Sequence, residues 1–198
     1  MTFTIRSRGG LHPHFPVQLL DGHNTTTDLE MIVDPMPRTA GDGFWDQTQP
    51  RMGPWFLPPF QRPAVWTIKQ KERFVESALL GVSLGSLVVV DALNCPMPSP
   101  DRFPATDRWL LDGQQRVSAL LAYRADEISI FRGTECEHRW SDLSIVERRK
   151  FWHIQIGIVK IKTVDPQYCR EIYDRMNFGG TAHTEDQRAT GPDVTVRA

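Results

Sequence analysis

The residues with the clearest chemical potential lie in one short stretch, residues 110–116, which reads LLDGQQR. Arg116 falls in the first turn of an expected helix, where a cation opposes the helix dipole at a cost of about 0.3–1 kcal/mol. A helix N-terminus with a nearby glycine and arginine is typical of a phosphate site. The pattern favours anion binding, and a well-capped helix with a surface arginine is the alternative.

Each residue of this motif has an expected position. Asp112 occupies the N-cap, and Gly113 leaves room for a ligand to approach the backbone. Gln114 lies close to the apolar side of the helix, half-buried, and needs a hydrogen-bond partner. Gln115 and Arg116 point away from the apolar side and are therefore the side chains that are free to meet a ligand.

Two further motifs place polar residues at defined points of the chain. Gln61 and Arg62 lie in PPFQRPAVW, where the prolines forbid a helix and force an extended path. Arg62 would meet the same anion as Arg116, or would stack on Trp66 through a cation–π contact. Asn177–Gly180 ends a helix, and its backbone N–H groups would form an anion nest or would only stop that helix.

Regular elements are expected around these motifs, in the pattern of an α/β (α+β) fold. The β-branched and alternating segments predict strands, and the apolar residues at helical spacing predict helices. The expected strands are 85–92, 108–111, 127–131 and 154–164, and the expected helices are 69–80, 114–123, 145–152 and 166–176. Thr67 is an expected N-cap, Ser144 opens a capping box with Glu147, and Leu29–Val33 is a short strand or a turn of helix.

Composition places the chain among soluble globular proteins: its 198 residues are 40% hydrophobic and 24% charged, with a net charge of −1. This balance excludes nucleic-acid binding by the overall charge, so any such contact needs a local patch. The three scattered cysteines form no CxxC or Cys/His cluster, which argues against a zinc site or a disulfide framework. No apolar run reaches about 18 residues and none opens the chain, so we expect a cytoplasmic protein outside the membrane.

We expect three parts along the chain. Residues 1–53 are rich in Gly, Pro, Thr and Asp, and we expect an irregular N-terminal extension that wraps the domain or is partly disordered. Residues 54–188 hold all three motifs and form the domain. Residues 189–198 have no periodicity and are expected to fray.

The three motifs, in the order PPFQRPAVW (58–66), LLDGQQR (110–116) and IYDRMNFGGTAHTEDQR (172–188), resemble the signatures of one bacterial family. This family forms the N-terminal half of GmrSD-type type IV restriction enzymes and related phage-defence proteins. The resemblance covers residues 54–188. It implies a ParB/sulfiredoxin-like fold, a small mixed sheet flanked by helices, with the DGQQR motif in a nucleotide-binding domain.

The resemblance also implies which residues form the nucleotide pocket. Asp112–Arg116 would face the phosphates, with Gln61 and Arg62 on the opposing wall and Asn177 and Gly180 closing the pocket. Better-known members bind or hydrolyse NTPs and thereby control the cleavage of modified DNA. The first hypothesis is therefore an NTP-binding, NTP-hydrolysing regulatory domain of a DNA-restriction or phage-defence system.

Under this hypothesis the candidate catalytic residues are Asp112, Gln115 and Arg116. Mg²⁺ would neutralise the phosphates, and Asp112 would ligate it or orient a water molecule. Gln115 would position the attacking water, as glutamines do in some NTPases. No other metal ligand is assigned.

Two other classes of function stay open. A non-catalytic, nucleotide-gated, ParB-like DNA-binding module would use the same pocket, and an inactive truncated copy would bind no ligand. The chain ends at Ala198 without the His-Asn-His arrangement of the nuclease that many members carry, so we expect no nuclease activity in this polypeptide alone. The expected partners are a nucleotide, DNA and a separate nuclease domain or subunit.

Overall fold

The computed structural model describes residues 22–35, 49–92 and 106–178. Its main sheet has four strands in the order β1-β6-β4-β5. These are β1 (Gly22–Asp28), β6 (Gln155–Ile161), β4 (Ser86–Val90) and β5 (Leu110–Asp112). β6 pairs in parallel with β4, whereas the β1–β6 and β4–β5 pairs are antiparallel. The sheet is therefore mixed, and together with the helices it confirms the expected α+β class.

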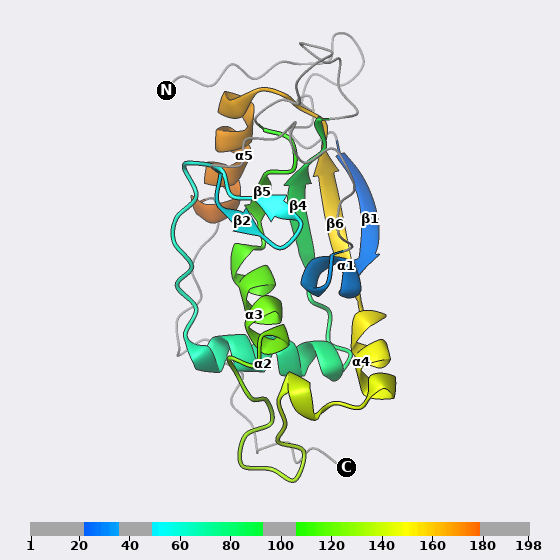
Figure 1. Cartoon of the computed structure of the whole chain (residues 1–198). Helices are drawn as coiled ribbons and strands as arrows, with labels where there is room; N and C mark the ends of the chain where they lie inside the picture. The colour runs from blue at the N-terminus through cyan, green and yellow to red at the C-terminus, as the bar shows by residue number, and fades with distance from the viewer. Residues whose placement is uncertain (1–21, 36–48, 93–105, 179–198) are drawn as a thin grey trace.

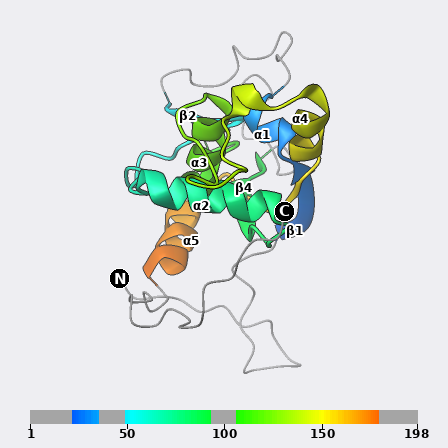
Figure 2. The same cartoon turned by 90° about the horizontal axis from the view of Figure 1, so that it is seen from below.

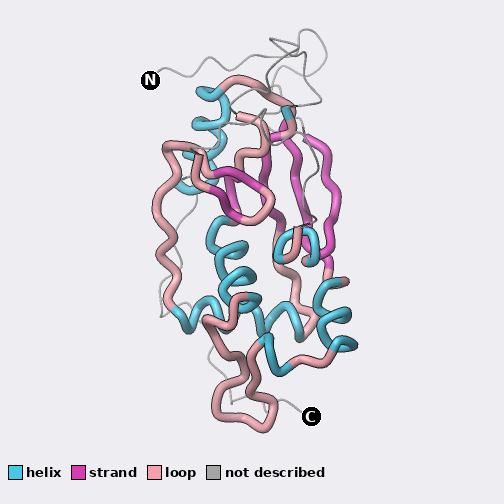
Figure 3. The backbone as a smooth tube through the Cα atoms, in the orientation of Figure 1, coloured by secondary structure: helices cyan, strands magenta, loops and turns pink. Residues whose placement is uncertain are grey.

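The helices are α1 (Glu30–Val33), α2 (Ile68–Leu79), α3 (Gln114–Arg124), α4 (Ile145–Trp152) and α5 (Pro166–Phe178), with a short 3₁₀ helix at Trp140–Asp142. In the view of Figure 1, α2, α3 and α4 lie below the main sheet and β1 forms its outer edge, and Figure 3 marks helix and strand along the backbone. A second, small sheet pairs β2 (Arg51–Met52) with β3 (Trp55–Phe56). Figure 2 shows α2 crossing the end of α3.

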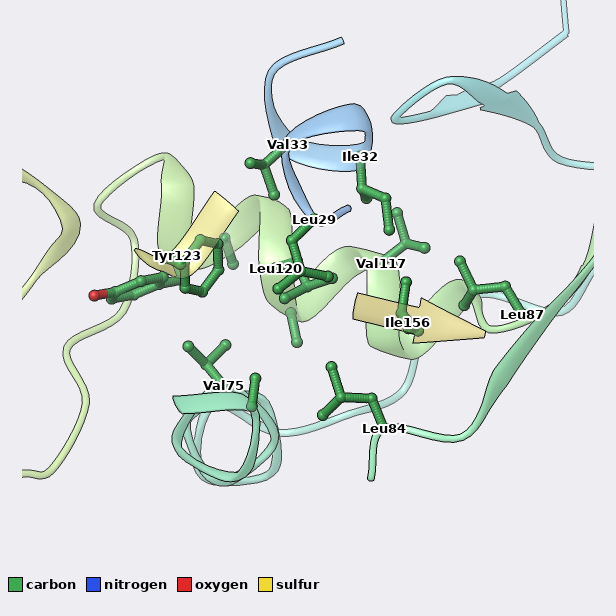
Figure 4. Packing of buried hydrophobic residues seen from close by; sticks show 14 of the residues in the cluster. Leu29, Ile32, Val33, Val75, Leu84, Leu87, Val117, Leu120, Tyr123 and Ile156 are labelled. Atoms are coloured by element: carbon green, nitrogen blue, oxygen red, sulfur yellow. The ribbon is translucent and has the colours of Figure 1, made fainter. Parts of the chain in front are cut away.

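Strand β4 separates two hydrophobic clusters because successive side chains of a strand point to opposite faces. Leu87 and Val89 join the larger cluster, which takes in residues of α1, α2, α3 and α4. Val88 and Val90 join the smaller cluster with residues of α5. Leu120 of α3 lies within the larger cluster (Figure 4). Hydrophobic side chains thus pack on both faces of the sheet, and α3 is anchored in the larger cluster.

Two of the helices begin as the sequence predicts. Thr67 caps α2 in a capping box with Gln70, and Ser144 caps α4 in a capping box with Glu147. In each box the hydroxyl accepts a backbone N–H of the first turn, and the longer side chain accepts the N–H of the cap residue. Both expected N-caps are therefore confirmed.

Strand β1 shows that the expectation of an irregular extension is wrong for residues 22–35. It pairs with β6 over its whole length, and Leu29, the N-cap residue of α1, and Ile32 within α1 are fully buried. The segment GHNTTTD lacks an alternating apolar pattern because β1 is an edge strand with exposed polar side chains, held by backbone hydrogen bonds. Residues 1–21 and 36–48, and the expected tail 189–198, lie outside the described residues.

The strand expected over residues 127–131 is also wrong. Only Ile130 makes a strand-like bridge there, with His138. The next residue, Phe131, has a φ of 54° and donates its backbone N–H to Glu76 Oε1 at 2.7 Å. A carboxylate on α2 therefore accepts an N–H that a longer strand would have donated to a neighbouring strand.

Candidate functional site

The DGQQR motif forms the turn between β5 and α3 and lines a cavity of about 120 Å³. Two other segments complete the cavity. One is the strap, which we define as residues 57–67 between β3 and α2, and the other is the end of α5. The described residues that line it are Gln61, Arg62, Trp66, Leu111, Asp112, Gly113, Gln114, Gln115, Arg116 and Asn177. The structure therefore brings the three sequence motifs to one place.

Gly113 is required by the backbone and by packing. Its φ is 108°, in the region that side chains other than glycine rarely adopt, and it is the N-cap residue of α3. A Cβ atom added here would lie 2.2 Å from Cδ2 of Leu87. The sequence predicts that Gly113 leaves room for a ligand, whereas in the structure the group that would meet a side chain here is Leu87, a core residue of β4.

Asp112 is not the N-cap of α3, and that expectation is wrong. Gly113 holds the cap position and no side chain caps the helix. The Asp112 carboxylate accepts instead from Nη2 of Arg116, at 2.5 Å, in an ion pair four residues apart. The cation in the first turn draws the carboxylate away from the backbone N–H groups because it is the stronger partner.

Arg116 is held at two points. Besides the Asp112 pair, its Nη1 donates to the backbone oxygen of Leu84 at 3.3 Å, and only 17% of its side chain is exposed. Gly85 makes this approach possible, since a Cβ there would lie 2.9 Å from Nη1. A guanidinium has five N–H donors, so these two bonds leave donors available to an anion. The support from Leu84 and Gly85 has no signal in the sequence motif.

Gln114 behaves as expected of an amide near the core. Only 7% of the residue is exposed, which is more burial than the expected half. Its Oε1 accepts from Nε2 of Gln61 on the strap at 3.2 Å. This side chain–side chain bond joins the first motif to the second across the floor of the cavity.

Gln115 differs from its expectation as a side chain free to meet a ligand. Its Oε1 accepts two backbone N–H groups of the strap, from Val65 at 3.1 Å and from Trp66 at 3.0 Å. Its Nε2 is buried and has no hydrogen-bond partner among the described residues. The carbonyl end of the amide therefore binds the protein's own backbone.

Arg62 lies on the opposite wall and reaches the end of α5. Its Nη2 donates to Oδ1 of Asn177 at 3.2 Å, and its backbone N–H donates to the hydroxyl of Tyr173 at 3.3 Å. The Nδ2 of Asn177 donates to the backbone oxygen of Tyr173 at 2.9 Å, which orients the amide. Arg62 and Arg116 line the same cavity, as expected. Gly180 lies outside the described residues.

Tyr173 was missed by the sequence reasoning although it lies inside the third motif. It precedes Asn177 by one helical turn, and its ring packs against Phe60 of the strap with centroids 5.4 Å apart. Phe60 also meets Trp109 edge-on at 5.6 Å. Helical spacing from Asn177 would have identified Tyr173 as a residue on the same side of α5.

Carboxylates are scarce around the cavity. Asp112 is the one acidic residue among its described lining residues, beside the two arginines. In the part of the chain that the structure describes, no group of three His, Cys, Asp or Glu is arranged to hold a metal ion. The net charge of the lining is therefore positive, which suits an anionic ligand.

A larger cavity, of about 500 Å³, lies elsewhere and is lined by Asp34, Lys71 and Arg124 among others. None of the motif residues lines it. Asp34 accepts from Arg124 at 2.8 Å and from Nε1 of Trp152 at 3.0 Å. Burial would raise the pKa of Asp34, but these hydrogen bonds and the nearby Arg124 charge outweigh it and lower the pKa. The Asp34 carboxylate and the Arg124 guanidinium are thus hydrogen-bonded to each other.

Comparison with known proteins identifies the family. The family model for the GmrSD restriction endonuclease, N-terminal domain, matches residues 46–187. The chain belongs to the GmrSD N-terminal domain family. This membership indicates a component of a restriction or phage-defence system. The comparisons with curated proteins and with solved structures gave no match.

The region matched to the GmrSD family contains the strap, the β5–α3 turn and α5, and therefore every described residue of the cavity. It begins at residue 46, so β1 and α1 precede it although both pack into the same domain. In the described part of the chain, no helix has the length and apolarity needed to cross a bilayer.

Proposed function

We propose that this GmrSD-family domain binds the phosphates of a nucleoside triphosphate at the N-terminus of α3 and hydrolyses the nucleotide to regulate restriction. The observation that carries the proposal is the convergence of Arg62 and Arg116 on one cavity from separate segments. Arg116 in the first turn of α3 and Arg62 on the opposite wall favour an anion through the guanidinium donors and the helix dipole together.

The dimensions of the cavity favour the phosphates as the group that it binds. Its volume of about 120 Å³ is below the roughly 300–1,000 Å³ of ordinary small-molecule pockets. A phosphate there would meet the free backbone N–H groups of the first turn of α3 and the remaining donors of Arg116. Arg62, which is exposed on the strap, would contact the anion from the opposite side.

Mg²⁺ fits this lining in one way only. Mg²⁺ is usually held by one or two carboxylates together with phosphate oxygens and water, and Asp112 is the described carboxylate in reach. The metal would supply charge neutralisation of the phosphates. Asp112 would hold it by exchanging its Arg116 partner for the ion, which would leave more of the Arg116 donors for phosphate.

A second candidate function is nucleotide binding without hydrolysis, in which the nucleotide gates DNA binding. It is favoured by the engagement of two candidate catalytic groups, since Asp112 is paired with Arg116 and the Gln115 oxygen accepts two strap N–H groups. Bound nucleotide would then act only by shifting a conformational equilibrium. DNA and a nuclease domain or subunit are the partners we propose under either function.

Titration calorimetry with ATP and with GTP, with and without Mg²⁺, tests the proposal, together with phosphate release in the presence and absence of DNA. We expect saturable binding to the wild type and to Arg73→Ala, an exposed arginine on α2, and weaker binding to Arg62→Ala. Phosphate release supports hydrolysis, and binding without release supports the gated module. Absence of binding to either nucleotide would contradict both and leave an inactive copy.

A further inference from the structure

The strap is fixed at its two ends, where Leu57 donates its backbone N–H to the oxygen of Pro50 and Thr67 forms the capping box of α2. It runs without regular secondary structure from β3 to α2, and residues 62–65 are exposed. Three backbone N–H groups in its middle donate to side chains of neighbouring helices: that of Arg62 to Tyr173 of α5, and those of Val65 and Trp66 to Gln115 of α3. The position of this wall of the cavity therefore depends on side-chain acceptors of neighbouring helices.

Gln115 provides two of those three bonds through a single atom. An amide oxygen has two lone pairs, and Val65 and Trp66 each donate one N–H to it, at 3.1 and 3.0 Å. The acceptor capacity of the side chain is thereby filled. In this arrangement its oxygen has no lone pair left with which to orient an attacking water molecule.

We propose that Gln115 is a positioning residue, which holds the strap against α3 so that Arg62 faces Arg116 across the cavity. This inference rests on the proposed function, in which both arginines bind the same anion. Arg62 lies three residues before Val65, and Pro63 between them has a restricted backbone. We therefore expect displacement at Val65 to shift Arg62, whose other contacts are those of its backbone with Tyr173 and of its guanidinium with Asn177.

Mutation can test the contact of the Gln115 oxygen with the strap by itself, because the amide nitrogen makes no described bond that would be lost at the same time. Nε2 is buried without a described partner, so the oxygen alone carries the contact with the strap. Gln115→Glu keeps an acceptor at this position and removes the unpaired donor, whereas Gln115→Met keeps the length and removes both polar atoms. Glutamate adds a negative charge beside an anion pocket, so this variant is used only in the measurement that needs no ligand.

Hydrogen exchange of the Val65 and Trp66 amides, measured by NMR on the full chain without ligand, tests the contact itself. We expect exchange to accelerate about tenfold or more in Gln115→Met and to stay close to wild type in Gln115→Glu. The matched control is Gln167→Ala, an exposed glutamine of α5, which should leave both amides unchanged. Unchanged exchange in a folded Gln115→Met would overturn the proposal.

Titration with ATP and with GTP, with Mg²⁺, tests the consequence for the cavity. In Gln115→Met we expect the dissociation constant to rise about tenfold, with a smaller change in turnover at saturating nucleotide. The reason is that the variant displaces the strap, which forms one wall of the cavity, and removes no group that takes part in the reaction. Lost turnover at unchanged affinity would assign Gln115 to water positioning and overturn the proposal. If the wild type binds neither nucleotide, the proposed function fails, while the exchange measurement still decides whether Gln115 holds the strap.

Discussion

Arg116 and Asp112 are joined by an ion pair of 2.5 Å within the turn that leads into α3. The carboxylate offsets the unfavourable position of a cation in the first helical turn, and it also competes with any anion for the same guanidinium. Under the proposed function, an anion that binds Arg116 would either use the remaining guanidinium donors or displace the Asp112 carboxylate. Replacing each partner separately distinguishes a structural pair from a ligand-binding one.

Arg116→Ala should weaken NTP binding by about 2–3 kcal/mol, because a charge-assisted contact at a helix N-terminus is lost. Since the side chain is mostly buried and has two partners, we also expect a loss of about 1 kcal/mol in the free energy of unfolding. Calorimetric titration and denaturant melts measure the two effects, with Arg73→Ala as the control. Equal affinity in wild type and variant would remove Arg116 from the site.

Asp112→Asn should strengthen NTP binding measured without Mg²⁺, because the carboxylate that competes with the phosphates for Arg116 is gone. The gain should be only about 0.5–1 kcal/mol, since solvent partly screens the ion pair. If Asp112 holds the metal, the same variant should lose the additional affinity that Mg²⁺ confers on the wild type. Titrations of both proteins with and without Mg²⁺ measure these effects. Weaker binding in the absence of metal would argue that the pair is needed to shape the turn.

Gly113→Ala should destabilise the fold by about 2–4 kcal/mol, because a residue with φ of 108° would acquire a side chain and the new Cβ would overlap Leu87. Urea denaturation of the variant measures the loss. Gly133→Ala is the control: Gly133 has a φ of 75°, but no atom lies within 4 Å of its added Cβ. A comparable loss of stability in both variants would indicate that the positive φ alone accounts for it and that the overlap with Leu87 contributes little.

Asp34→Asn should lower the free energy of unfolding near pH 7 by about 1–2 kcal/mol, because charge-assisted hydrogen bonds to Arg124 and Trp152 are weakened. The folded-state pKa of Asp34 lies below its ordinary value of 3.8, so its contribution to stability is present above that value and is lost as the pH falls through the folded pKa.

Denaturation at pH 7 and in the acid range below 3.8 measures the effect on Asp34. We expect the difference between wild type and Asp34→Asn to shrink toward zero in acid. Asp174→Asn, an exposed carboxylate on α5, should show little difference at either pH. A difference for Asp34→Asn that does not change with pH would point to packing as its cause.

The elements that frame the site could be predicted because their signals are local. Thr67 and Ser144 mark helix starts through bonds within one turn, and Val117 and Leu120 mark the buried side of α3 through helical spacing. The expected strands at β4 and β6 follow from β-branched and alternating residues. Each of these signals depends on residues that lie within a few positions of one another.

The two wrong assignments of secondary structure, at β1 and at residues 127–131, have one physical cause in common. β1 pairs with β6 through backbone groups, and polar side chains such as Thr25 and Thr26 carry little sign of that pairing. Ile130 lies where a strand was expected, but a carboxylate from α2 binds the N–H of the following residue. In both cases the decisive partner lies far away in the sequence.

The sequence by itself determined the type of most elements around the motifs, because capping signals and periodicity are local, and its resemblance to the GmrSD family implied that the three motifs share one pocket. Only the tertiary structure decided what those residues touch. Gln115 accepts the backbone N–H groups of Val65 and Trp66 instead of remaining free. Gln114 accepts from Gln61, which lies 53 positions earlier in the chain. The reason is that a polar side chain takes the strongest partner within hydrogen-bonding distance, and folding determines which groups come that close.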